Sequence, residues 1–440
     1  MSTNNTVPSP HREWPFGRIP QDWRAVPLKH LCRRFSLYGA NIPAEDYQAE
    51  GVRFIRTSDI REDGTLGGGG VFVSAELVPD SMLVEGDFLI SRSGTVGRAY
   101  VYRADHGLCA YAGYLVRYVL RNPETPRWLF YITKSPSFQQ WLGASAIEAT
   151  IGNVNGEKYA NLVVPVPPIH KQRAIADYLD RETARIDDLV MAKERVLALL
   201  AEKRQAIITH AVTRGLNPHA PLCDSGIPWL GEIPAHWETE RARWLFRERD
   251  ERSESGEEEL LSVSHLTGVT PRSEKDVNMF EAETTEGYKV CLADDLVINT
   301  LWAWMGAMGV SPVNGIVSPA YNVYQPGPRL DPKFVDALVR IPIFAQEVTR
   351  YSKGVWSSRL RLYPEGFFEV FLPVPSIDEQ RAIVAHISAE TAKLDAMRSA
   401  TGHTIALLKE RRAALIAAAV TGKIDVSGAD RQVTAVAYNE

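Results

Sequence analysis

The chemistry visible in this sequence is that of binding, and it is concentrated at one turn. The stretch ISRSGTVGRA (90–99) predicts a strand that delivers Arg92 to a Ser-Gly-x-x-Gly turn, with Arg98 beyond it. The amides of Ser93 and Gly94, together with the two arginines, suit a phosphate, and arginine can also pair bidentately with guanine in the major groove. An ordinary hairpin with surface arginines explains the stretch equally well.

A related turn recurs in the second half of the chain with different side chains. The stretch TLWAWMGAMG (300–309) carries Trp302, Trp304 and Met305 after a strand-like apolar run. These residues form either part of a core or an apolar contact surface, and Trp302 and Trp304 are candidate DNA-binding residues. Burial in a core is the more common outcome for an isolated aromatic pair.

Small polar and basic residues gather twice, each time shortly before a Val-Pro junction. They are Asn153, Asn155 and Lys158 in the first half, and Lys353, Ser357, Ser358, Arg359 and Arg361 in the second. Asparagine can read adenine, serine is permissive, and lysine and arginine hold phosphates. A solvated loop would have a similar composition, but the recurrence in both halves favours binding. Three further polar candidates lie on short strand-like runs, namely Arg56, Ser58 and Ser264.

No catalytic set is visible in the sequence. There is no G-x-x-x-x-G-K-[ST] phosphate loop, no H-E-x-x-H motif and no Cys/His cluster. The four cysteines, Cys32, Cys109, Cys223 and Cys291, form no C-x-x-C pair and fit a reducing compartment. SPAY (318–321) resembles the Asn/Asp-Pro-Pro-Tyr loop of amino-methyltransferases but lacks the leading Asn or Asp, and a turn before a strand explains it. We therefore expect this chain to bind no metal or cofactor.

The sequence segments that are expected to position the candidate residues are repeated along the chain. Residues 165–213 and 373–421 agree at 23 of 49 positions when they are aligned without gaps at an offset of 208. Upstream, GRIPQDW (17–23) matches GEIPAHW (231–237) in an Ile-Pro-x-x-Trp frame. An internal repeat of this kind indicates a duplicated architecture.

Each repeated segment predicts a long helix that starts at proline or serine and stops at glycine. Apolar residues recur mostly at three-, four- or seven-residue steps: Ile175, Leu179, Ile186, Leu189, Val196, Leu200 and Ile207, then Ile383, Ile387, Leu394, Met397, Leu408 and Leu415. Such a narrow stripe indicates a coiled coil. Each helix would be roughly 60 Å long at 1.5 Å per residue.

The segments before each helix alternate short β-like runs with Gly/Pro/Asn turns and add a helix-like piece, which is typical of a compact mixed α/β domain. The predicted fold is α+β (mixed α/β), with globular domains at 1–164 and 217–372, long helices within 165–216 and 373–425, and a flexible tail at 426–440.

Composition places few limits on the partner. The net charge is −5, and much of the acidic excess lies in the run RERDERSESGEEEL (247–260), which we interpret as a solvated loop. With 45% apolar residues, no apolar run of about 20 residues and a polar N-terminus, the sequence predicts a cytoplasmic globular protein.

The repeated junction carries a family resemblance. PVPPIHKQRAIADYLDRETARIDDL (165–189), its second copy PVPSIDEQRAIVAHISAETAKLDAM (373–397) and SGIPWLGEIPAHWE (225–238) are similar to the specificity subunit of type I restriction–modification systems. The characteristic P-x-P-x-x-x-x-Q-x-x-I pattern falls on Pro165, Pro167, Gln172 and Ile175, and on Pro373, Pro375, Gln380 and Ile383. The first-half counterpart REWPFGRIPQDW departs by lacking the full Gly-Ile-Pro-Trp-Leu-Gly run.

This resemblance implies two target-recognition domains, each reading one half of a split, asymmetric site in double-stranded DNA. The two helices would pack antiparallel as a spacer, and two methyltransferase subunits would dock on them. Residues assigned to spacing and docking are Gln172, Ile175, Leu179, Ile186, Leu200, Gln380, Ile383, Ile387, Leu394 and Leu408. S-adenosylmethionine, ATP and Mg²⁺ would belong to partner subunits, which methylate adenine and, through a restriction subunit, cut DNA. The alternatives are a coiled-coil scaffold that binds only protein, and a methyltransferase or nuclease with an unrecognised site.

Overall fold

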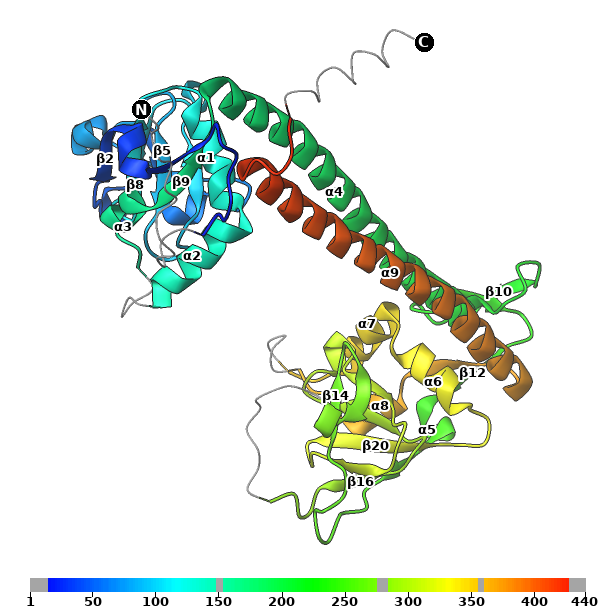
Figure 1. Cartoon of the computed structure of the whole chain (residues 1–440). Coiled ribbons are helices and arrows are strands. Elements are labelled where there is room, and N and C mark those ends of the chain that lie inside the picture. Colours follow the sequence, from blue (N-terminus) through cyan, green and yellow to red (C-terminus); the bar gives the residue numbers. More distant parts are fainter. Residues whose placement is uncertain (1–14, 148–152, 275–283, 355–359, 427–440) are drawn as a thin grey trace, which may run out of the picture. The chain divides into compact units, whose positions relative to one another are not determined.

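The computed structural model describes residues 15–147, 153–274, 284–354 and 360–426. The chain divides into two compact units. Unit 1 contains residues 1–193 and 403–440, and unit 2 contains residues 194–402. Each unit therefore holds one of the predicted globular segments together with parts of both long helices (Figure 1).

Unit 1 is built on a four-stranded antiparallel sheet in the order β2-β8-β5-β6. Its strands are β2 (Cys32–Tyr38), β5 (Phe88–Ser91), β6 (Ala99–Val101) and β8 (Leu115–Leu120). A three-stranded sheet contains β3 (Val52–Ile55), β4 (Val71–Val73) and β7 (Cys109–Tyr111), and a two-stranded one pairs β1 (Arg24–Pro27) with β9 (Val163–Val166). The helices are α1 (Thr125–Lys134), α2 (Pro136–Ile147) and α3 (Gly156–Asn161).

Unit 2 repeats this plan with a sheet in the order β13-β20-β17-β18. Its strands are β13 (Phe246–Arg249), β17 (Leu296–Asn299), β18 (Met308–Val310) and β20 (Tyr321–Pro326). Two-stranded sheets pair β10 (Leu222–Asp224) with β11 (Glu232–Pro234), β12 (Glu238–Arg241) with β21 (Phe371–Val374), β14 (Leu261–Ser264) with β15 (Gly268–Pro271), and β16 (Lys289–Cys291) with β19 (Gly315–Val317). The short helices are α5 (Ala242–Leu245), α6 (Pro332–Val339), α7 (Pro342–Tyr351) and α8 (Pro364–Phe368).

A buried aspartate precedes the central strand in each unit. Asp87, before β5, lies 2.6 Å from Arg117 Nη2, and its equivalent Asp295, before β17, lies 2.7 Å from Arg249 Nε. Each carboxylate also accepts the backbone amide three residues earlier, at 2.7 and 2.9 Å. Burial raises the pKa of the Asp87 carboxyl, while those same hydrogen bonds oppose the shift. The two sheets thus share a buried Asp–Arg ion pair as well as their strand order.

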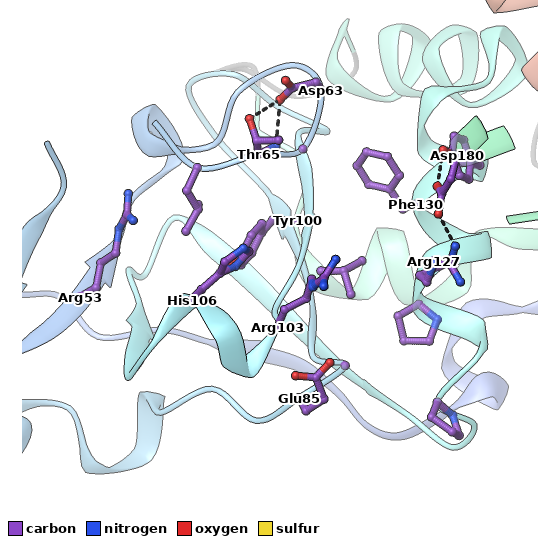
Figure 2. Close-up of a pocket in the computed structure, with 17 residues that line it drawn as sticks. Arg53, Asp63, Thr65, Glu85, Tyr100, Arg103, His106, Arg127, Phe130 and Asp180 are labelled. Carbon is purple, nitrogen blue, oxygen red and sulfur yellow. Dashed lines mark hydrogen bonds and ion pairs between the residues drawn. The ribbon is translucent and has the colours of Figure 1, made fainter. Parts of the chain in front are cut away.

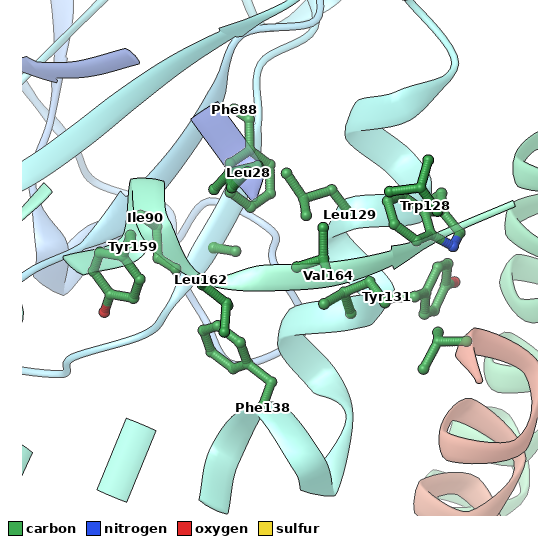
Figure 3. Packing of buried hydrophobic residues seen from close by; sticks show 14 of the residues in the cluster. Leu28, Phe88, Ile90, Trp128, Leu129, Tyr131, Phe138, Tyr159, Leu162 and Val164 are labelled. Carbon is green, nitrogen blue, oxygen red and sulfur yellow. The ribbon is translucent and has the colours of Figure 1, made fainter. Parts of the chain in front are cut away.

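The core of unit 1 joins the four-stranded sheet to the helices. Phe88 and Ile90 of β5 and Trp128 and Leu129 of α1 are buried in one cluster with the start of the first long helix (Figure 3). Amphipathic α1 covers the cluster because its apolar residues recur at helical spacing. The corresponding cluster of unit 2 includes Leu296, Tyr324 and Phe334.

The two long helices are α4 (Ile169–Arg214) and α9 (Ile377–Val420), within the predicted segments. They pack antiparallel. In unit 1, the start of α4, with Ile175 and Leu179, shares a core with the end of α9, which includes Ile416. In unit 2, the end of α4, with Val212, shares a core with Ile383 at the start of α9. The predicted mixed α/β fold with a long helix pair is confirmed.

In each unit the Ile-Pro-x-x-Trp motif packs against the glycine that follows a long helix. Gly422, after α9, has φ +70°, and an added Cβ there would meet Pro20 Cγ at 2.5 Å and Trp23 Cζ2 at 3.1 Å. Gly215, after α4, has φ +72° and lies in the same way against Trp237. Trp237 Nε1 also donates to Glu379 Oε1 at 3.0 Å.

Part of the predicted helix seam is exposed. The predicted apolar seam included Leu189, Val196 and Met397, but these side chains are 45%, 37% and 53% exposed, so that part of the seam is wrong. The expected flexible tail, apart from Val426, lies outside the described residues.

Candidate nucleic-acid interface

The predicted residues of the first turn lie in a cleft of unit 1 of about 1320 Å³, which we call the arginine cleft. It is formed by the end of β2, the turn after β3, the turn after β5 and the segment after β7. Its lining comprises residues 38–43, Tyr47, Phe54, 56–58, 92–95 and 112–114. Five predicted binding residues are brought together there, namely Arg56, Ser58, Arg92, Ser93 and Gly94.

Arg92 is the arginine best placed for contact with a ligand. Its guanidinium carbon lies 5.0 Å from the centroid of the Tyr38 ring. The backbone of Arg92 is fixed on both sides, since its amide donates to Tyr114 O at 3.0 Å and its carbonyl accepts from Val154 N at 2.9 Å. Its Nε is buried and has no hydrogen-bond partner among the described residues. A guanidinium held against an aromatic face is preorganised for a planar anion or a base edge.

The Arg56 side chain is paired with a residue of its own turn. Its Nε and Nη2 donate to the two carboxylate oxygens of buried Asp59 at 3.1 and 2.9 Å, and its guanidinium lies 5.8 Å from the Tyr47 ring centroid. The hydrogen bond to Asp59 raises the pKa of Arg56. This pair fixes the 3-10 turn Thr57–Asp59 and leaves Ser58 exposed toward the cleft. Arg56 therefore shapes the cleft with much of its charge already compensated.

The other first-half candidates have mainly internal partners. Arg98 Nη1 donates to Ile60 O at 2.8 Å, outside the cleft lining. Asn155 caps α3 by accepting the amide of Lys158 at 2.8 Å. Asn153 adjoins Val154, whose amide joins it to Arg92, and its buried Oδ1 has no partner among the described residues. Of these residues, Asn153 has the strongest claim to face a ligand.

Sequence reasoning missed the aromatic and amide residues of the cleft. Tyr38 and Tyr114 are 45% and 60% exposed, and Tyr47, Asn41 and Thr57 also line it. Tyr38 OH accepts the Gly156 amide at 3.0 Å. In strand-like sequence a tyrosine normally indicates a core position, so only the pairing of strands distant in sequence shows that these rings meet two arginines. Aromatic faces beside arginine are typical of nucleic-acid surfaces.

A second cleft of unit 1, of about 830 Å³, has no predicted site residue among its lining (Figure 2). Its charged groups largely satisfy one another. Arg127 on α1 pairs with Asp177 at 2.8 Å and with Asp180 on α4, and Tyr131 also donates to Asp180 at 2.5 Å. Tyr100 and His106 share a hydrogen bond of 2.5 Å. These pairs attach α1 to α4, which gives this cleft a structural role.

In unit 2 the equivalent turn exposes tryptophan. Trp302 is 51% exposed and stacks on Trp304, with ring centroids 6.2 Å apart and 23° between the planes. The expectation of a core position is therefore wrong for Trp302, because the turn packs through Ala303 instead. Lys353 and Arg361 exchange backbone hydrogen bonds of 2.9 and 3.0 Å and are both exposed. Ser264 closes the β14–β15 turn with Thr267, whereas Ser357, Ser358 and Arg359 lie outside the described residues.

The helix residues assigned to spacing and docking mostly face inward. Gln172, Ile175, Leu179, Ile186, Leu200, Gln380, Ile383 and Leu394 are buried, and Ile387 and Leu408 are half-buried. Gln172 and Gln380 each donate from Nε2 to the carbonyl five residues earlier, at 3.0 and 2.9 Å. Their burial suits a structural role within the chain, so a docking partner would need other, exposed positions.

Among the described residues, no group of three or more His, Cys, Asp or Glu side chains is placed to hold a metal ion. Within the same part of the chain, no helix has the length and apolar character required to cross a membrane. Burial raises the pKa of the Cys32 and Cys291 thiols to about 12, so neither is an activated nucleophile.

The two units share one strand order, and each contains parts of both long helices, so the architecture is internally duplicated. Residues 20–195 match the family described as the type I restriction modification DNA specificity domain. The StySPI specificity subunit of Salmonella potsdam is 21% identical over 219 residues, covering 48% of this chain and 47% of that protein. The EcoBI specificity subunit of Escherichia coli is 21% identical over 332 residues, covering 67% and 65%. The chain thus spans about half of the first relative's length and two thirds of the second's.

Solved structures agree on the fold. A chain from a study of complex assembly and conformational transition of the type I R-M system superposes with a TM-score of 0.72 at 16% identity, covering 92% of this chain and all of that one. The HsdS subunit of Thermoanaerobacter tengcongensis gives a TM-score of 0.53 at 17% identity, covering 92% and 98%. Residues 20–195 thus resemble the DNA specificity domain of type I restriction–modification systems, and the chain has the fold of these solved structures.

Proposed function

We propose that this chain is the non-catalytic DNA-reading subunit of a type I restriction–modification complex, and that each unit reads one half of a split, asymmetric site. The observation that carries the proposal is the turn after the central strand. It occupies the same place in both sheets but presents Arg92 and Ser93 in unit 1 and Trp302 in unit 2. One scaffold with two different contact surfaces is suited to reading two different sequences.

The arginine cleft supports DNA as the ligand of unit 1. Arg92 can donate two parallel hydrogen bonds to O6 and N7 of guanine or to a phosphate, and the Tyr38 ring limits its orientation. Exposed Tyr114 and Ser58 add a ring and a hydroxyl at the same cleft. The net charge of −5 is compatible with this role if partner subunits supply part of the phosphate contact.

Exposed apolar residues on the helices support the docking of two copies of one methyltransferase subunit. Leu199 and its equivalent Leu407 are 61% and 51% exposed, and Leu189 and its equivalent Met397 are also exposed. Unit 1 contains Leu189 and Leu407, and unit 2 contains Met397 and Leu199. Duplicated apolar positions of this kind fit a partner that binds twice.

The remaining chemistry belongs to partners in this proposal. The methyltransferase subunits would use S-adenosylmethionine to modify an adenine in each half-site. The restriction subunits, bound through the methyltransferase, would use ATP and Mg²⁺. The complex would act in the cytoplasm on double-stranded DNA.

A genome-wide map of N6-methyladenine in cells with and without this gene tests the proposal. With the methyltransferase present, deletion should remove methylation from one bipartite motif and from no other. If the map is unchanged while the methyltransferase is expressed and active, the chain is instead a scaffold that binds only protein.

A further inference from the structure

We propose that Trp302 of unit 2 reads a thymine through its 5-methyl group, so that the two units discriminate bases by different chemistry. This inference rests on the proposed function, since it assigns a base contact to the second recognition unit. Its basis is the structural equivalence of the two turns, the exposure of the tryptophan on a turn with a fixed backbone, and the basic residues of the segment hydrogen-bonded to that turn.

The equivalence of the turns is supported by bonds as well as by sequence. Each turn follows the central strand that begins after the buried aspartate. The carbonyl of Arg92 accepts the Val154 amide at 2.9 Å, and the carbonyl of Thr300, 208 residues later, accepts the Leu362 amide at 3.1 Å. Trp302 therefore stands two residues beyond the position equivalent to Arg92, at the place of Gly94.

Hydrogen bonds fix the backbone of the tryptophan turn, residues 299–307. Trp302 donates its amide to Asn299 O at 3.0 Å, and its carbonyl accepts the amides of Met305 and Ala307 at 3.0 and 3.1 Å. Trp304 Nε1 donates to Leu301 O at 3.1 Å, and Ala303 is fully buried. The turn therefore presents a half-exposed apolar ring, stacked on Trp304, on a backbone that is held in place.

The segment that is hydrogen-bonded to this turn carries exposed basic residues, which favour DNA as the molecule contacted. The Leu362 amide that bonds to the turn directly follows Arg361, which pairs with Lys353 through the backbone. Both basic residues are exposed and suited to phosphates. An exposed apolar ring on a turn whose hydrogen-bonded neighbour segment is basic fits a DNA duplex better than it fits an apolar protein surface.

The chemistry of the ring selects the base. In the major groove, the thymine methyl is the apolar feature among the base edges, and it is read by apolar side chains. Trp302 contributes a broad apolar face, whereas Arg92 contributes hydrogen-bond donors that suit guanine or phosphate. Unit 2 should therefore depend on a methyl group where unit 1 depends on charge.

The test uses the complete complex of this chain with its methyltransferase and measures initial methylation rates on duplexes carrying the mapped motif. Each thymine of the half-site assigned to unit 2 is replaced in turn by deoxyuridine, which removes only the methyl group. Wild-type complex should lose about fourfold in rate at low DNA concentration at one such position, as expected for one buried methyl. Trp302→Gln should be slower on thymine and should no longer distinguish thymine from uridine there.

Two controls separate the outcomes. Trp302→Leu keeps an apolar side chain and should retain the preference for thymine, and uridine in the other half-site should affect wild type and Trp302→Gln alike. The inference is overturned if Trp302→Gln retains the wild-type uridine effect, if no uridine matters, or if the variant fails to co-purify with the methyltransferase. The proposed function survives each of these results provided that Arg92→Ala still alters recognition of the other half-site.

Discussion

Arg204 on α4 donates from Nη1 to both carboxylate oxygens of Asp395 on α9, at 2.7 and 2.8 Å. The duplication repeats this ion pair, because Asp187 and Arg412 are the equivalents of Asp395 and Arg204. Arg412 Nε and Nη2 lie 2.9 and 3.1 Å from the Asp187 carboxylate. One ion pair lies in each unit. The same repeated residues therefore join α4 to α9 in both units.

Charge reversal of Arg204 tests this register. Arg204→Asp would set two carboxylates against each other and should lower the free energy of unfolding by about 1 kcal/mol, since both groups are partly exposed. Arg204→Asp combined with Asp395→Arg should restore most of that loss in urea unfolding. If the double reversal is no more stable than the single one, the two residues do not interact in solution.

Three glycine substitutions should differ in sign. Gly422→Ala places a Cβ at positive φ against Pro20 and should destabilise the protein by about 1–2 kcal/mol or more. Gly215→Ala, where the nearest atom is 3.2 Å away, should be milder. Gly402→Ala lies within α9 with open space around its Cβ and should stabilise by up to about 1 kcal/mol. Thermal unfolding of the three variants checks this order, and equal effects would contradict the described helix ends.

Loss of the buried aspartate should be far more damaging than loss of a helix ion pair. Asp87→Asn leaves the Arg117 guanidinium, which is 10% exposed, without its counter-charge and should cost about 3–5 kcal/mol. Replacing both partners, as Asp87→Leu with Arg117→Met, should recover part of that loss. Urea unfolding measures both variants, and a mild effect of Asp87→Asn would show that Arg117 is solvated.

Arg92→Ala should weaken recognition of one half-site without unfolding unit 1, because the side chain contacts Tyr38 at the surface of the cleft. A lost bidentate base contact corresponds to about 1–3 kcal/mol. The measurement is the methylation rate of the complex on duplexes mutated at each position of the motif. Arg103→Ala is the matched control, since Arg103 is an exposed arginine of the same unit that lines the other cleft. Equal effects of the two variants would mean that Arg92 acts only through general charge.

The helices could be predicted from the sequence because their information is local and repeated. The Gln-x-x-Ile junctions, the apolar spacing and the glycine stops each depend on neighbouring residues, and the duplication provides an independent second copy. What the sequence did not settle was which apolar helix positions stay exposed. Leu189 and Met397 fit the stripe as well as Leu200 does, and only the packed partner distinguishes them.

The arginine cleft could be predicted only in part. Arg92 and its turn stand out because arginine, serine and glycine occur together. Tyr38, Tyr47 and Tyr114 could not be assigned to it, because they come from separate segments that meet only when β2 pairs with β8 and β3 pairs with β7. Trp302 was misjudged for a related reason, since the burial of an aromatic residue on a turn depends on distant elements such as α7.

Each unit is proposed to read one half of the site on a shared scaffold. Exchange of one recognition segment tests it most directly. Residues 28–162 would be replaced by the corresponding segment of a specificity subunit with a different motif, and N6-methyladenine would be mapped in cells carrying the chimera. The account predicts that one half of the bipartite motif changes while the other half is retained. A change in both halves, or in neither, from a chimera that still co-purifies with the methyltransferase would contradict it.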